Sequence, residues 1–145
     1  MTVAQRSITA GELALRRCDP ALLGTMVAAG RFARAEGTAL LCLRHVVAAA
    51  LGVQPVTARR TLERAGVEVD RVLWCLQEFA TDVPDGEALD VGSIRLSSRL
   101  ALLFYVLAGR PGPISFGTLV QAVLDGPSSL SSTPTSALLD ACRLR

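Results

Sequence analysis

Hydrophobic positions along the chain recur every three or four residues, which is the spacing of amphipathic α-helices rather than of strands. Asp19-Pro20 is a typical helix start, with Asp as the N-cap and Pro at the first helical position. The apolar repeat that follows continues until Gly37, where we expect the helix to end. Two further helices are expected at about 43–51 and 56–65, each followed by a glycine.

The segment at about 68–80 has the clearest amphipathic pattern, with apolar residues on one face and charged residues largely away from it. Residues 81–95 are polar and acidic and contain Pro84 and two glycines, which is typical of a linker. The pattern therefore predicts a group of helices on each side of one linker.

Beyond the linker a helix is expected to begin near Ser97, and residues 100–108 are apolar at all nine positions. Such a run predicts a helix that is buried on every side. The large aromatic residues near it in the pattern are expected in the core as well: Trp74, Phe79, Phe104 and Tyr105. Two more helices are predicted, at about 115–124 and 133–142, and no segment predicts a strand.

The two halves of the chain repeat one another. Residues 41–51 (LCLRHVVAAAL) and 114–124 (ISFGTLVQAVL) have similar spacing of apolar positions over eleven residues. In a duplicated sequence each copy covers the apolar face of the other. We therefore expect an all-α fold in which two pseudo-repeated helical motifs pack as one bundle. The expected divisions are an N-terminal extension (1–17) and one domain (18–145), with repeat one at about 18–80, the linker at 81–95 and repeat two at about 96–145.

Composition limits the class of protein. Half of the residues are hydrophobic and the net charge is only +2, which excludes a disordered chain and gives no sign of a nucleic-acid or anionic-membrane partner. The four cysteines form no C-x-x-C pair, so neither a zinc ribbon nor a disulfide scaffold is expected. No secretory signal is visible, and the best membrane-spanning candidate, 38–56, contains Arg44 and His45. We therefore expect a cytoplasmic protein with free thiols, no cofactor and no membrane partner.

The repeated segments resemble the amino-terminal (Clp repeat) domain of Clp-type AAA+ unfoldases. That family carries two copies of a helical motif, each with a segment close to (I/V)-G-T-E-H-L-L-L-A-L-L. The family pattern lies on 19–67 without a gap: Gly37 falls on the turn glycine, His45 on the motif histidine, and 61–67 (TLERAGV) on the A-L-x-x-L-G-V stretch. The second copy, about 96–139, is shorter by roughly one helical turn.

The departures from the family pattern bear on function. The family glutamate before the histidine, which in some members helps to bind phosphorylated arginine, is Arg44 in the first copy and Gly117 in the second. Without two carboxylates for a guanidinium, no phosphoarginine site of that kind is expected. The chain has no G-x-x-x-x-G-K-[ST] motif, so it is not expected to be an ATPase motor by itself.

The resemblance implies a non-catalytic protein-interaction module whose partner is a Clp-type unfoldase, an adaptor or a substrate of an unfoldase–protease system. The initiator Met and the end at Arg143-Leu144-Arg145 favour a free-standing copy over one cut from a longer unfoldase. A type VI secretion version, which binds sheath protein, is a variant of the same hypothesis.

Cys42 and His45 are the residues closest to a catalytic pattern. They lie at i and i+3 near the start of one predicted helix, where a thiolate–imidazole pair could form. No third, orienting carboxylate lies nearby in the sequence, so structural packing is the favoured interpretation. A metal site on these two residues with Cys18 and Cys75 has only one usefully spaced pair. We therefore expect no catalytic residue and no metal site.

Two other classes of function stay open as alternatives. The segment 57–62 (TARRTL) reads like the recognition helix of a helix-turn-helix DNA-binding regulator, although acidic residues nearby and the small net charge weigh against it. The groove between the repeats could bind a small molecule, in a biosynthetic protein recruited from the Clp amino-terminal fold.

The predicted partner-binding residues flank the repeated segments: Arg44, His45, Arg59, Arg60 and Arg64. We expect Arg44 to be exposed beside His45. Arg60 and Arg64, at i and i+4, are expected on one side of their helix, with Leu62 turned inward. Arginine is common among the residues that dominate protein interfaces, and a merely solvated basic face is the alternative.

Overall fold

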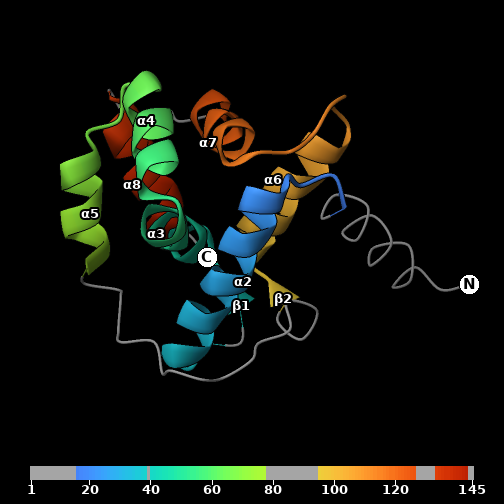
Figure 1. The fold of residues 1–145 in the computed structure, drawn as a ribbon, viewed down its shortest axis with the longest axis horizontal. Helices are drawn as coiled ribbons and strands as arrows, with labels where there is room; N and C mark the ends of the chain where they lie inside the picture. Colours follow the sequence, from blue (N-terminus) through green and yellow to red (C-terminus); the bar gives the residue numbers. More distant parts are fainter. Residues whose placement is uncertain (1–15, 39, 78–94, 127–132, 144–145) are drawn as a thin grey trace, which may run out of the picture.

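The computed structural model describes residues 16–38, 40–77, 95–126 and 133–143. Over these residues the chain is mostly helical, which confirms the all-α class (Figure 1). The helices are α2 (Pro20–Ala35), α3 (Leu43–Val53), α4 (Pro55–Arg64), α5 (Val69–Gln77), α6 (Ser98–Ala108), α7 (Phe116–Asp125) and α8 (Pro134–Arg143). Residues 1–15 of the expected extension, 78–80 of the fourth predicted helix and 81–94 of the expected linker lie outside the described residues.

The predicted helix starts are confirmed by their caps. The Asp19 carboxylate accepts a hydrogen bond of 2.7 Å from the backbone N–H of Leu22 at the start of α2. Ser97 does the same for α6, and Ser115 does so for α7. Each cap satisfies one backbone donor that the first turn of a helix leaves without a partner inside the helix.

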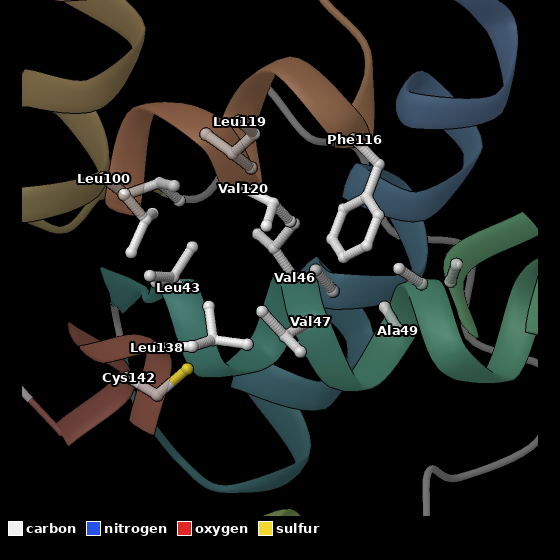
Figure 2. Close-up of a cluster of buried hydrophobic side chains, with 14 of the residues drawn as sticks. Leu43, Val46, Val47, Ala49, Leu100, Phe116, Leu119, Val120, Leu138 and Cys142 are labelled. Atoms are coloured by element: carbon white, nitrogen blue, oxygen red, sulfur yellow. The ribbon is translucent and has the colours of Figure 1, made fainter. Parts of the chain in front are cut away.

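α3 lies at the centre of the molecule and is buried along nearly its whole length. It contacts α2, α4, α5 and α8. Figure 2 shows the side chains of α3 meeting those of α7 and α8 in one cluster of buried apolar residues: Leu43, Val46, Val47, Phe116, Leu119, Val120 and Leu138. The core is therefore mostly aliphatic and is built around the first of the two repeated segments.

Two very short strands correct the expectation of a chain without strands. β1 (Leu40–Leu41) pairs in parallel with β2 (Arg95–Leu96), and an isolated parallel bridge joins Cys18 to Ile114. The N-cap residue that precedes the first turn of a helix is extended, so the residues just before it can pair with a neighbouring segment. The backbone N–H of Ser97 donates to the carbonyl of Leu41, and that of Asp19 donates to the carbonyl of Ile114, both at 2.9 Å.

The prediction that 100–108 is buried on every side is wrong. Leu100, Phe104 and Leu107 of α6 are buried, but Leu102, Tyr105 and Val106 on its other side are exposed. α6 lies at the edge of the described bundle and packs mainly on α7, so only one of its faces is covered (Figure 1).

Two aromatic residues that were expected in the core are also on the surface. Trp74 is 69% exposed and Tyr105 is 71% exposed. Trp74 lies on the outer side of α5, whose other side is anchored by Val72 and Leu76. Among the described helices, none is long and apolar enough to cross a membrane.

Candidate functional site

A buried polar cluster lies at the start of α3. One carboxylate oxygen of Glu36 accepts a hydrogen bond of 2.6 Å from Nη2 of Arg44, and the other lies 2.9 Å from Nε2 of His45. Glu36 is the C-cap residue of α2. Gly37, at a φ of 78°, turns the chain back toward α3 so that the end of α2 meets the first turn of α3.

Sequence reasoning missed Glu36. No orienting carboxylate was found beside Cys42 and His45 in the sequence, but the glycine turn brings Glu36, nine positions before His45, into contact with it. The signal was present in the sequence: a glycine stop directly after Glu36, followed within a few residues by the next helix, predicts antiparallel neighbours whose ends face each other.

Both ring nitrogens of His45 are occupied by structural hydrogen bonds. Nδ1 accepts from the backbone N–H of Cys42 at 2.9 Å, and Nε2 donates to Glu36. Burial lowers the pKa of His45 below its ordinary value, although Glu36 opposes this. This network assigns His45 the neutral form with its proton on Nε2. Its Nδ1 lone pair is already used by the Cys42 amide, so His45 caps α3 and does not act as a base for the Cys42 thiol.

The expectation that Arg44 is exposed is wrong. Its surface is only 8% exposed, because even the first turn of the central helix is covered by neighbouring helices. Burial alone would raise the pKa of Glu36, but the hydrogen bonds from Arg44 and His45 hold it below its ordinary value. Glu36 and Arg44 thus form an ion pair inside the fold. Partner binding by Arg44 or His45 would require this cluster to open.

The arginines of α4 are exposed as predicted. Arg59, Arg60 and Arg64 face solvent, while Ala58 and Leu62 of the same helix are fully buried. Nη1 of Arg59 lies 3.2 Å from Oδ1 of Asp70, the second residue of α5. We call Arg59, Arg60 and Arg64 the α4 basic face.

Trp74 extends this surface onto α5. It follows Asp70 by four residues, so the two side chains lie on the same side of the helix. α4 and α5 are in contact and lie beside one another in Figure 1. A tryptophan therefore lies next to the aspartate that holds Arg59. Sequence reasoning missed it because Trp74 was assigned to the core.

The corresponding start of α7 is built from uncharged groups. The hydroxyl of Thr118 accepts a hydrogen bond of 2.6 Å from the backbone N–H of Ser115, just as Nδ1 of His45 does for Cys42. Gly117 stands where the first segment has Arg44. A Cβ added at Gly117 would make only ordinary contacts, at 3.5 Å to Ser115 and 3.6 Å to Thr61, so packing alone does not demand glycine here.

The thiols of Cys18 and Cys142 show no sign of activation. Burial raises the pKa of Cys18 to about 11 and that of Cys142 to about 12, so both are protonated at neutral pH. Within the described part of the chain, no three His, Cys, Asp or Glu residues gather closely enough to hold a metal ion.

A pocket of about 290 Å³ lies between α6 and α7. Its walls are mostly apolar, although three charged side chains also line it. The lining residues are Arg99, Leu102, Leu103, Val106, Arg110, Ala122, Val123, Asp125 and Gly126. Comparison of the chain with protein-family models, with curated proteins and with solved structures finds no match.

Proposed function

We propose that this chain is a non-catalytic protein-interaction module with a two-repeat fold similar to the Clp amino-terminal domain, and that it binds a Clp-type unfoldase, an adaptor or a substrate through the α4 basic face. The observation that carries the binding proposal is the presentation of three exposed arginines on a helix whose other side is locked into the core by Ala58 and Leu62. A rigid, basic and exposed face of this kind fits an acidic surface on a partner.

The two bridges between the halves support the two-repeat part of the proposal. Leu41, just before the second helix of repeat one, pairs with Leu96, just before the first helix of repeat two. Ile114, just before the second helix of repeat two, pairs with Cys18, just before the first helix of repeat one. Exchanging the two repeats therefore turns one bridge into the other, as a pseudo-twofold relation requires.

Matching burial of the two repeated segments is a second support. Six corresponding pairs are buried in both segments: Leu41 and Ile114, Leu43 and Phe116, Val46 and Leu119, Val47 and Val120, Ala49 and Ala122, and Ala50 and Val123. The pairs differ where the polar residues lie, since Arg44 and His45 are buried and Gly117 and Thr118 are half-buried. This agreement supports a repeat that extends from sequence spacing to packing.

The residue types on the α4 surface favour a protein partner. Arginine and tryptophan are the residues most often found to dominate binding at protein interfaces, and both kinds lie here within two neighbouring helices. Exposed arginines add little to stability, so this surface is free to serve recognition.

The geometry favours this function over DNA binding. α3 and α4 are joined by Gln54 alone, whereas a helix-turn-helix needs a turn of about 3–4 residues between its helices. One of the three arginines, Arg59, is already paired with Asp70. An electrophoretic shift of random duplex DNA at low salt by the purified chain would reverse this preference.

The test uses the double variant Arg60→Glu/Arg64→Glu and the charge-matched control Arg31→Glu/Arg143→Glu, which changes exposed arginines on α2 and α8. Binding to the Clp-type unfoldase of the organism that makes this chain is measured by biolayer interferometry, and degradation of fluorescein-labelled casein is followed with the protease added. We expect at least a roughly tenfold loss of affinity for the α4 variant and none for the control, at unchanged melting temperature. Equal binding by all three proteins, or by none, overturns the proposal.

A further inference from the structure

We propose that the pocket between α6 and α7 is a second docking site, which takes a partner helix that carries apolar side chains along one face and an acidic residue near each end. This surface shares no residue with the α4 basic face. The proposal rests on the chain being a protein-interaction module, but not on its likeness to the Clp family.

The outer side of α6 is an unusually apolar surface. Leu102, Tyr105 and Val106 are exposed and lie at i, i+3 and i+4, so their side chains form one stripe along the helix. The opposite side of α6 is already anchored in the core, so the stripe is not needed to hold α6 in place. Contiguous exposed apolar surface of this kind marks interaction sites in water-soluble domains, whereas single exposed residues do not.

The stripe continues into a concave surface. Leu102 and Val106 belong to both the stripe and the pocket, and Leu103 of α6 with Ala122 and Val123 of α7 completes its apolar wall. A convex apolar stripe beside a shallow apolar pocket is suited to a helix that lays one face into a groove, with a side chain inserted in the pocket.

Two arginines mark the ends of this groove. Arg99, in the first turn of α6, and Arg110, two residues beyond its last residue, both line the pocket. A separation of eleven residues corresponds to about three turns, or roughly 16 Å, along a helix. Nε of Arg99 is buried and has no hydrogen-bond acceptor among the described residues. Asp125 is the one carboxylate in the lining. Positive charge therefore exceeds negative charge, and one arginine nitrogen lacks an acceptor.

The loop that carries Arg110 is held in place. The guanidinium of Arg17 donates hydrogen bonds to the carbonyls of Ala108, Arg110 and Gly112. This clamp fixes the end of α6 and adds a further positive charge near it. A groove whose cationic end is preorganised loses less freedom when an acidic segment binds.

The charge pattern selects the occupant. A second copy of this chain docked face to face would place Arg99 and Arg110 of one copy near those of the other. A small aliphatic carboxylate would neutralise one arginine and leave the other about three turns away. A partner helix with an acid near each end satisfies both arginines and covers Tyr105.

The probe is a synthetic fluorescein-labelled peptide of about 15 residues with leucines along one helical face and glutamates at two positions eleven apart, matching Arg99 and Arg110. The control peptide carries lysine at the same two positions. Binding to the full chain is measured by fluorescence anisotropy. We expect the glutamate peptide to bind at least about tenfold more tightly than the lysine peptide, with the difference shrinking at high salt.

Protein variants locate the site. Val106→Glu and the milder Tyr105→Ser are expected to abolish or weaken binding. Arg110→Glu leaves Arg99 in place and is expected to remove most of the preference between the two peptides. Val56→Glu, a matched change at another exposed apolar residue, should bind like the wild type. The Arg60→Glu/Arg64→Glu variant should also bind the peptide normally, which separates this site from the α4 basic face.

Three results would overturn the proposal. Equal binding of the two peptides would show that Arg99 and Arg110 do not select an acidic partner. A dimer in sedimentation velocity that Val106→Glu converts to a monomer would identify a second copy as the occupant. Stoichiometric binding of decanoate, lost in Val106→Glu, with no binding of the glutamate peptide would identify a small-molecule site instead.

Discussion

The starts of α3 and α7 solve the same problem with different chemistry. In both helices, the side chain of the third residue accepts a hydrogen bond from the backbone N–H of the N-cap residue. His45 accepts from Cys42 in α3, and Thr118 accepts from Ser115 in α7. At α3 this cap is buried and tied to the ion pair of Glu36 and Arg44, whereas at α7 it is half-buried and uncharged. The backbone arrangement is thus independent of the charges that accompany it.

Charged residues have different roles in this molecule according to their burial. A buried ion pair contributes little in net terms, but breaking it takes the opposite charge away from a group in a poorly solvated place. The α4 arginines are charged as well, yet they are solvated and can be changed at little cost. The cluster at the start of α3 is therefore expected to be sensitive to substitution for structural reasons, and the α4 basic face for reasons of binding.

The largest loss of stability is expected from Glu36→Ala, which removes the buried ion pair at the start of α3. Arg44 would lose the Glu36 carboxylate while staying buried, and His45 would lose the partner of its Nε2. We expect a loss of about 3–5 kcal/mol in the free energy of unfolding, measured in urea. Asp70→Asn, which breaks the exposed pair with Arg59, is the control and should cost below about 1 kcal/mol. Similar losses for the two variants would contradict the burial of the Glu36 pair.

A smaller effect is expected from removing the two caps separately. His45→Ala leaves the buried N–H of Cys42 without its acceptor and should cost about 1–3 kcal/mol. Thr118→Val keeps the size of the side chain but removes the acceptor for Ser115, where water can take its place, and should cost about 1 kcal/mol or less. His45→Thr places at this position the residue found in the second repeated segment, and should recover part of the stability lost in His45→Ala. A Thr118→Val variant as unstable as His45→Ala would show that the two caps are equally buried.

Local features of the fold were predictable from the sequence because they depend on neighbouring residues. The caps at Asp19, Ser97 and Ser115 and the glycine stop at Gly37 act within one turn of a helix, and each was found where the sequence placed it. The helical class follows from the same short-range periodicity.

Burial and pairing across the chain were not predictable in the same way. An apolar run such as 100–108 specifies a helix but not how many neighbours cover it, and α6 turned out to lie at an edge. Arg44 looked like a surface residue because its partner, Glu36, belongs to the preceding helix. The short strands form between the two halves, so no single segment carried their signal.

The smallest change in stability is expected from a change of pH. Of the starts of α3 and α7, only that of α3, with His45 and Glu36, contains groups that titrate in acid, whereas the cap of α7 is uncharged. Burial lowers the pKa of His45 from an ordinary value of 6.5, and the bonds from Arg44 and His45 hold the pKa of Glu36 below 4.5 although burial opposes this. In acid the unfolded chain then binds more protons than the folded protein, so stability falls as the pH falls. The midpoint of thermal unfolding should be constant between about pH 7 and 8, decline below 6.5 through His45 and decline further below 4.5 through Glu36. His45→Thr should lose the first decline and keep the second, and a midpoint that rises between about pH 7 and 5 in the wild type would contradict the assignment of a neutral, buried His45.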